Sequence, residues 1–367
     1  MRGVDKRFMV VSSRKIASIF MLKVVEAPLA GHPDKVCDQI VESVVDEYLR
    51  RDPLTRMDIQ ALGSNGMVML GGVVDSRADF DAAAVGRAAY VAAGYNDAIE
   101  LFVNLDKPTE DNARTMVRGG AQGTAIVHGY ATKETREMLP RAVVYANLIA
   151  RRIDDLRNND QRFSWLRPDG KVQVATEGDR LRAVTVIVEH DSSMDLSIVQ
   201  SQIVDEAIAP SLPSIEGVTI LVNSGGSFTQ GGFGANAGVS GRKVLADSYG
   251  GLLPHGGMGL AGKDPLKPGR SGTYMARFAA KTLVSEGVAS NVLITAMYAL
   301  GIAEPLVLSA KSGNGDDLTD IVKQRFDFRP EAIVERLGLR RPIYSMSATY
   351  GMFGRAGLPW EDIDVEK

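Results

Sequence analysis

The stretch Gly31-His-Pro-Asp-Lys-Val-Cys-Asp-Gln-Ile40 marks the start of the first well-patterned helix of this 367-residue chain. Glycine and proline punctuate its first half as a turn, and apolar side chains then recur at Val36, Ile40 and Val44. Because this spacing places them on one helical face, we predict a helix over residues 36–49. The turn over residues 31–35 therefore presents polar side chains at a helix N-terminus.

Strand-like and helix-like patterns alternate outward from this stretch. We predict helices over residues 36–49, 81–93, 139–156, 198–209 and 272–285, strands over residues 67–74, 172–176, 181–189 and 217–223, and a turn over residues 167–170. This alternation favours an α/β fold of the α+β sandwich type, with helices on one face of each sheet.

The patterns fall into three blocks of similar content, which are compatible with a diverged threefold repeat. We predict an N-terminal extension over residues 1–20, with Met21 as an alternative start, and a gate-like loop over residues 106–125, because a long polar loop in a compact chain is often functional. The subdomains are then expected at residues 21–105, 126–226 and 227–367.

Composition excludes several classes of protein. Hydrophobic residues make up 45% and charged residues 24% of the chain, which is typical of a soluble globular protein, and the net charge of −3 argues against nucleic acid as a partner. The single cysteine, Cys37, excludes an intrachain disulfide. Since no apolar run approaches the ~20 residues that span a bilayer, we expect no membrane association and a cytoplasmic location.

Cations on tight turns next to glycine or proline are the main chemical signal. Glycine lets backbone N–H groups approach a ligand, so several such turns can together bind a polyanion. Asp34 and Asp264 lie beside these cations, and their carboxylates suit Mg²⁺ on a polyphosphate. The cations are His32, Lys35, Lys171, Arg242, Lys243, Lys263 and Lys267.

The stretch Gly257-Met-Gly-Leu-Ala-Gly-Lys263 fits both the phosphate-binding pattern G-x-x-x-x-G-K and the dinucleotide pattern G-x-G-x-x-G. The first pattern requires Ser or Thr next, where Asp264 stands, and neither pattern has its preceding hydrophobic strand. We therefore interpret the stretch as a glycine-rich loop with a general anion-binding role.

At these same residues the chain resembles the methionine adenosyltransferase (S-adenosylmethionine synthetase) family. Matching segments follow the family's order from about residue 22 to residue 361. They include Gly31-His-Pro-Asp-Lys35, Gly66-Met-Val-Met-Leu-Gly-Gly72, His128-Gly-Tyr-Ala-Thr132, Trp165-Leu-Arg-Pro-Asp-Gly-Lys171, Gly241-Arg-Lys243, Gly262-Lys-Asp-Pro265 and Ala348-Thr-Tyr-Gly-Met-Phe-Gly-Arg355.

The resemblance implies a fold of three similar α/β subdomains about a pseudo-threefold axis. It also implies a homodimer or dimer of dimers, in which chains pair through flat sheet faces and share active sites. The expected reaction is attack of a thioether sulfur on C5′ of ATP, with loss of the whole triphosphate and its hydrolysis. ATP, a small sulfur-containing substrate and Mg²⁺ are the implied ligands.

The resemblance also gives roles to particular residues. His32 is expected near the C5′–O5′ bond that breaks, Asp34 as the Mg²⁺ ligand, and Asp169 near the substrate pocket and ATP. Arg242 can grip phosphate oxygens with two hydrogen bonds, whereas lysines act as point charges. The expected triphosphate clamp, with His32 the predicted catalytic set, comprises Lys35, Lys171, Arg242, Lys243, Lys263 and Lys267.

Several positions depart from the family's pattern, and most of them lose a carboxylate. Val73 stands where the family has a glutamate that contacts the methionine amino group, and Asn236 replaces an aspartate that faces adenosine and methionine. Asp106 aligns near a glutamine of the mobile gate. Those three residues form the predicted acceptor pocket, while Gly269 replaces a metal-holding aspartate and Gln60 replaces the glutamate associated with K⁺.

Four functions fit these residues. The first is synthesis of S-adenosylmethionine from ATP and methionine, and the second is adenosyl transfer to another sulfur or soft nucleophile that lacks the α-amino group. A triphosphatase and a catalytically silent nucleotide-binding paralogue are the others. The retained His32 argues against the triphosphatase and the silent paralogue, because its role lies at C5′. Between the two adenosyl transfers, the family's usual substrate favours methionine as the acceptor.

Overall fold

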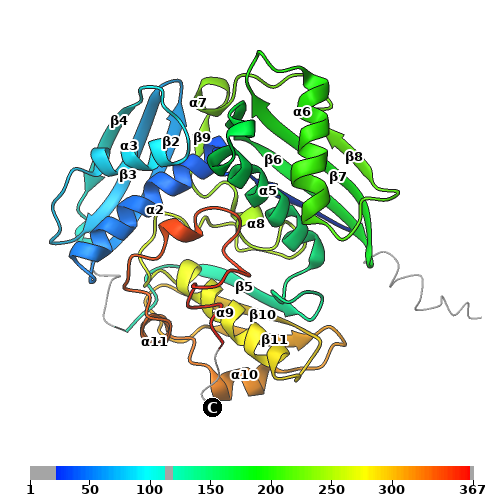
Figure 1. Ribbon diagram of the computed structural model, residues 1–367. Coiled ribbons are helices and arrows are strands. Elements are labelled where there is room, and N and C mark those ends of the chain that lie inside the picture. Colours follow the sequence, from blue (N-terminus) through cyan, green and yellow to red (C-terminus); the bar gives the residue numbers. More distant parts are fainter. Residues whose placement is uncertain (1–21, 112–118, 364–367) are drawn as a thin grey trace, which may run out of the picture.

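The computed structural model describes residues 22–111 and 119–363, which form a mixed α/β structure with three sheets. Figure 1 shows three sheet-and-helix units, with the long helices α2, α5 and α9 directed toward the centre of the molecule. The predicted α/β class with three similar units is confirmed. The predicted extension over residues 1–20 lies outside the described residues, as does part of the predicted gate-like loop.

The first sheet has the order β1-β6-β7-β8 and carries helix α5 on one face. Strands β1, β6 and β7 are antiparallel neighbours, and β8 joins β7 in parallel. The bounds are β1 Leu22–Pro28, β6 Leu166–Glu177, β7 Arg180–His190, β8 Thr219–Val222, α5 Arg141–Asn159 and α6 Leu196–Ile203.

The second sheet has the order β4-β3-β2-β9 and is covered by helices α2 and α3. Helix α2 begins with Pro33 in its first turn, and His32 caps it by accepting a hydrogen bond from the Asp34 backbone N–H through Nδ1 at 3.2 Å. The bounds are α2 Pro33–Arg51, β2 Arg56–Ser64, β3 Met67–Asp75, α3 Ala82–Ala92, β4 Glu100–Asp106 and β9 Gly238–Val239.

The third sheet has the order β11-β10-β5 and packs against helix α9. Short helices α7 (Gly232–Ala235) and α8 (Val244–Asp247) lie in the glycine-rich connection before it. The other bounds are β5 Ala125–Thr132, α9 Pro268–Ser285, β10 Asn291–Tyr298, β11 Val307–Ser312, α10 Thr319–Arg325 and α11 Pro330–Arg336.

Each sheet contains a strand from another third of the chain. Strand β1 precedes α2 but pairs with β6, β5 pairs with β10, and β9 pairs with β2. Backbone hydrogen bonds therefore cross all of the predicted subdomain boundaries, and the three units interlock. The boundaries themselves stay a prediction about the sequence.

The helices predicted over residues 36–49, 139–156 and 272–285 are found, with ends that differ by a few residues. The helix predicted over residues 198–209 changes to a wider helical turn at Val204. The turn predicted over residues 167–170 is wrong, because these residues lie inside β6. A register shift between Leu166 and Gly170 lets Pro168 and Asp169 interrupt the ladder without ending the strand.

The sheet faces opposite the helices are rich in exposed apolar side chains. Along β2, the residues that alternate toward α2 are buried, whereas Leu62 on the other face is 51% exposed. Large exposed hydrophobics of the three sheets include Leu22, Val24, Leu62, Met67, Met69, Phe102, Ile126, Ile187, Leu221, Met297 and Val307. We call these surfaces the open sheet faces.

Candidate active site

A cavity of about 680 Å³ lies at the N-terminus of helix α2. Strand β6, the segment around β9 and the loop before α8 bring their polar side chains to its wall. The lining residues are His32, Pro33, Asp34, Asp169, Gly170, Lys171, Ile187, Phe228, Asn236, Ala237, Arg242 and Lys243. Six predicted ATP-site or metal residues and Asn236 of the predicted acceptor pocket are therefore brought together, and we call them the cavity cluster.

The cations of the cavity cluster are held by two carboxylates. Lys171 Nζ lies 3.1 Å from Glu26, and Lys243 Nζ lies 3.4 Å from Asp34. Arg242 lies 2.7 Å from Asp34 and is half exposed, so its guanidinium remains accessible. Three cations therefore lie together around Glu26 and Asp34, and this side of the cavity suits the oxygens of a polyanion.

The ring of His32 is neutral at physiological pH. Burial, together with the positive charge of Lys243, lowers the pKa of His32 to about 4. Since Nδ1 accepts the Asp34 backbone N–H, the ring proton of the neutral form is carried by Nε2. His32 is therefore built to donate one hydrogen bond without changing its charge.

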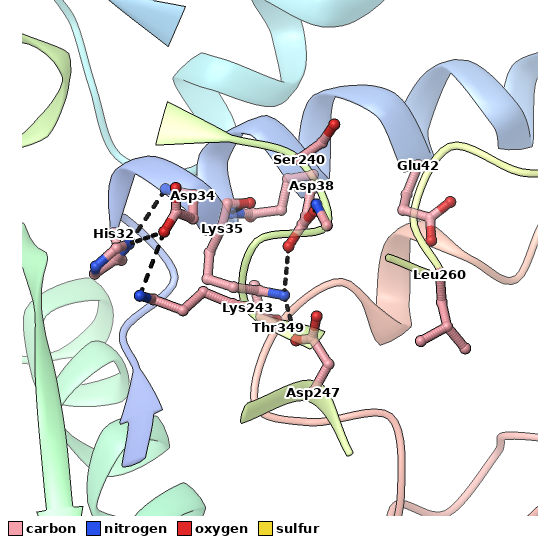
Figure 2. Close-up of polar contacts among 12 residues, drawn as sticks. His32, Asp34, Lys35, Asp38, Glu42, Ser240, Lys243, Asp247, Leu260 and Thr349 are labelled. Carbon is pink, nitrogen blue, oxygen red and sulfur yellow. Dashed lines mark hydrogen bonds and ion pairs between the residues drawn. The ribbon is translucent and has the colours of Figure 1, made fainter. Parts of the chain in front are cut away.

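Asp34 is fully buried at the centre of this network, as Figure 2 shows. Burial raises the pKa of Asp34, but the hydrogen bonds from Arg242 and the Val239 backbone N–H and the charge of Lys243 together outweigh it, and the net pKa is lowered. Oδ1 accepts the Val239 backbone N–H at 2.9 Å, while Oδ2 is buried without a hydrogen-bond partner. Lys243 Nζ lies 3.4 Å from Oδ2 as an ion pair, and an ionised carboxylate whose second oxygen accepts no hydrogen bond fits a hard cation such as Mg²⁺.

Among residues 22–111 and 119–363, no group of three or more His, Cys, Asp or Glu side chains is arranged to hold a metal ion. Asp264 does not reinforce Asp34, because its two oxygens accept the backbone N–H groups of Met57 and Leu266 at 2.8 Å. A cation at Asp34 would therefore take its remaining ligands from phosphate oxygens and water.

Asp169 lines one wall of the cavity, and a second buried acid, Glu189, lies beside it. Asp169 accepts the Gly232 backbone N–H at 2.9 Å, and Glu189 accepts those of Gly231 and Asp169 at 2.8 and 3.3 Å. Burial, with a contribution from the charge of Glu189, raises the pKa of Asp169 to about 6. A cationic ligand group at this wall would relieve that mutual repulsion.

A second group of predicted residues lies apart from this cavity, on the open face of the β2–β3–β4 sheet. Val73 is paired with Asp58 on β2 and with Asp106 on β4, so the three side chains share one face. Lys263 Nζ is 3.7 Å from Asp58, and burial lowers the pKa of Lys263. We call Asp58, Val73, Asp106 and Lys263 the sheet cluster, and Lys267 follows it at the N-cap of α9.

Lys35 lines neither group. Its side chain is 1% exposed, and its ammonium is enclosed between Asp38, at 2.8 Å, and Asp247. Burial alone would lower the pKa of Lys35, but the two neighbouring carboxylates raise it and keep the ammonium charged. A contact of Lys35 with the triphosphate stays a prediction that this enclosure does not favour.

Three family models together cover almost the whole chain. The N-terminal, central and C-terminal domains of S-adenosylmethionine synthetase match residues 21–108, 118–228 and 230–362. The chain belongs to the S-adenosylmethionine synthetase family. It is therefore a member of a family of transferases that bind ATP.

Curated relatives match over nearly their full lengths. An S-adenosylmethionine synthase of Maridesulfovibrio salexigens is 37% identical over 93% of this chain and 94% of its own. Those of Sorangium cellulosum and Aquifex aeolicus are 36% and 34% identical, over 92% and 94% of this chain and 87% and 97% of their own. The resemblance to the family is thus confirmed, at an identity that fits a divergent member.

Several residues of this family member's site were missed by the sequence analysis. Glu26 lies on a strand with no glycine-rich turn, Asp247 ends the short helix α8, and Glu189 lies near the end of a strand that reads as apolar. The available signal was a charge inside an otherwise apolar run, as at Glu26 in Val-Val-Glu-Ala. Asp58 carried no signal, because only the strand register places it beside Val73.

A larger cavity of about 980 Å³ lies beneath α9, α10 and α11. It contains none of the residues through which the chain resembles S-adenosylmethionine synthetases at their ATP site. Arg325 is paired there with Glu286, and Arg336 stacks on the rings of Phe278 and Phe326. Size alone does not make it the catalytic cavity.

No helix within residues 22–111 and 119–363 has the length and apolar character needed to cross a bilayer.

Proposed function

We propose that this protein transfers the adenosyl group of ATP to the sulfur of methionine, forming S-adenosylmethionine. In this reaction the sulfur–C5′ bond forms as the C5′–O5′ bond breaks, and the triphosphate leaves with the bonding electron pair. No side-chain nucleophile is needed. The protein must hold the two reacting atoms in line and stabilise the growing charge on the leaving group.

The observation that carries the proposal is the cavity cluster around neutral His32. Arg242, Lys243 and Lys171 hold the triphosphate oxygens, and the backbone N–H groups at the start of α2 add to the positive field. His32 donates its Nε2–H to the bridging oxygen at C5′ as that oxygen gains charge. Because the ring is already neutral, it needs no proton transfer beforehand.

Family membership implies the use of Mg²⁺ and K⁺. We propose that Asp34 Oδ2 holds Mg²⁺, which when bound neutralises charge on the triphosphate. The residue at the family's K⁺ position fits a cation less well than Asp34 fits Mg²⁺. Gln60 carries no charge, and its Oε1 already accepts a hydrogen bond from Ser240 at 2.9 Å. We therefore propose no K⁺ site at Gln60.

We further propose that two chains, alone or within a dimer of dimers, pair through their open sheet faces. Lys171 of the cavity cluster, its ion-pair partner Glu26 and Asp58 of the sheet cluster all alternate onto these faces. Exposed apolar side chains surround them, and contiguous apolar surface of this kind is typical of interaction sites. Pairing would place the cavity cluster of one chain against the sheet cluster of its partner, completing each active site.

The acceptor is proposed as methionine because acids remain available for its α-ammonium group. Asp169 lines the cavity wall with Glu189 beside it, and Asp58 flanks Val73 on the sheet cluster. The loss of carboxylates at Val73 and Asn236 supports a second candidate, a sulfur nucleophile without the amino group. An unpaired ammonium in a closed site costs several kcal/mol. Methionine would therefore bind much more weakly than an acceptor without the amino group if no acid paired with its ammonium.

The test incubates the purified full chain with ATP, Mg²⁺ and a panel of thioethers and thiols, with products read by mass spectrometry. We expect S-adenosylmethionine from millimolar methionine. Product only from acceptors without an amino group would replace methionine with the second candidate. Loss of ATP without an adenosylated product, or no turnover with any acceptor, would contradict adenosyl transfer. The family's typical compartment, the cytoplasm, is the location we propose for the reaction.

A further inference from the structure

Helix α2 carries acids at four-residue intervals, and each one holds a different part of the C-terminal third of the chain. Asp34 accepts the backbone N–H of Val239 at 2.9 Å, Asp38 that of Gly241 at 2.7 Å, and Glu42 that of Gly262 at 3.3 Å. Residues four apart lie on one helical face. These hydrogen bonds therefore fix the segment 239–262 along one face of helix α2.

The buried ammonium of Lys35 links one acid of this helix to an acid of the fixed segment. Figure 2 shows its ammonium between Asp38, on the same helix, and Asp247, at the end of α8. Asp38 bonds Lys35 through Oδ2 and the Gly241 amide through Oδ1. Lys35 thus ties both ends of the segment 241–247, one through Asp38 and the other directly.

Arg242 and Lys243 directly follow the first anchor, at Gly241, and are the only cations in the segment's sequence, Gly-Arg-Lys-Val-Leu-Ala-Asp. Gly241 adopts φ +76°, and a Cβ there would lie 2.9 Å from Cα of Gly259. The segment therefore passes its first anchor by a route open only to glycine. The backbone between the anchors and the two cations therefore has little conformational freedom.

We propose that Lys35, Asp38 and Asp247 are positioning residues, which hold the segment 239–247 so that Arg242 and Lys243 face the triphosphate. This inference rests on the proposed function, since it assigns a geometry to the same anion site. It also changes the role of Lys35, from a cation that touches phosphate to a cation that anchors two acids.

Substitution of an acid gives the sharpest test. The electric field alone and the positioning role predict opposite changes in the affinity for a polyanion. Removing the Asp247 carboxylate makes the surroundings more positive, so by the field alone a polyanion would bind more tightly. Under the positioning role, Asp247→Asn weakens the anchor of α8 and displaces Arg242 and Lys243. We expect binding of inorganic tripolyphosphate with Mg²⁺ to weaken at least ~10-fold, measured by calorimetry on the full chain.

Glu361→Gln is the matched control. Glu361 is also a buried acid, paired with buried Arg277 at 2.8 Å, and it holds no part of the segment 239–247. We expect this variant to lower the melting temperature comparably and to leave tripolyphosphate affinity unchanged. Equal loss of affinity in the control would attribute the effect to general destabilisation and overturn the proposal.

Adding Lys35→Met to the double variant Asp38→Asn/Asp247→Asn separates anchoring from direct contact. Both acids that Lys35 anchors are already neutral in that background, so we expect Lys35→Met to leave the affinity unchanged. A further ~10-fold loss would place Lys35 on the phosphate itself and overturn the positioning role. If Asp247→Asn does not fold, Asp38→Asn carries the same test, because it weakens the other anchor.

The outcomes also separate this inference from the function on which it rests. A wild-type chain that fails to bind tripolyphosphate would refute the clamp and the positioning role together. A wild-type chain that binds it, with Asp247→Asn binding equally or more tightly, would refute the positioning role alone.

Discussion

The cavity cluster and the sheet cluster contain residues of one predicted site, yet the fold keeps them apart. The cavity cluster joins the α2 N-terminus to β6 and the segment before α8, with three cations around His32. The sheet cluster is a row across β2, β3 and β4 with a single buried cation, Lys263. The cavity cluster therefore has cations that can hold a triphosphate. The sheet cluster has acids on a face that a second chain can cover. We propose that a single chain carries two half-sites.

The largest expected effect tests the cavity cluster. Lys171→Met removes a cation that is 35% exposed and, among the residues that the structure describes, is paired only with Glu26. We expect adenosyl transfer to fall by about 10²–10³-fold, because one preorganised charge on the leaving group is lost. The melting temperature should change little, since exposed pairs contribute about 0–1 kcal/mol. Lys23 lies on β1 and is paired with Glu134. Lys23→Met breaks that pair, is the control and should retain activity.

A mixing experiment tests whether the two half-sites belong to different chains. Lys171→Met disables the cavity cluster and Lys263→Met the sheet cluster, and each variant alone should be nearly inactive. Co-expressed chains that pair at random should recover roughly a quarter of wild-type activity, because each mixed dimer contains one intact site. An inactive mixture of folded, dimeric variants would show that both clusters act within one chain.

The pH dependence of stability sharpens the account of His32. The unfolded chain protonates this ring below about pH 6.5, whereas the folded chain does so only near pH 4. Between these values the unfolded state binds more protons, so the free energy of unfolding decreases as pH falls, by up to about 3 kcal/mol. His32→Asn keeps a capping side chain and should flatten this slope in denaturant titrations from pH 7 to 4. An unchanged slope would argue for an ordinary, solvated histidine.

The smallest expected effect concerns the acceptor. Asn236→Asp restores an acid to the cavity wall, and we expect the KM for methionine to fall by about 3–10-fold through attraction to its ammonium group. Val73→Glu should gain less, because Asp58 and Asp106 already flank that position. A matched thioether without the amino group serves as the comparison substrate. Equal effects on both substrates would mean that these positions do not select for the amine.

The sequence alone was sufficient for the local elements and for much of the cavity cluster. Helix α2 follows from Pro33 and the apolar spacing after it, and Lys171, Arg242 and Lys243 follow from charges beside glycine. The turn predicted at Pro168 and Asp169 failed, because strand pairing with β7 outweighed the local preference for a turn. Local signals locate residues well but do not determine their partners.

Which residues face which ligand was decided by long-range contacts. Lys35 has the same local signature as Lys171, but helix α2 turns it inward onto Asp38 and Asp247. Asp58 and Val73 are 15 positions apart and meet only through the β2–β3 register. The sequence by itself determined the family, the helical start at His32 and the supply of cations. The tertiary structure alone decided which cations are free for a ligand and which are neutralised by buried acids, because burial and pairing depend on segments that are distant in the chain.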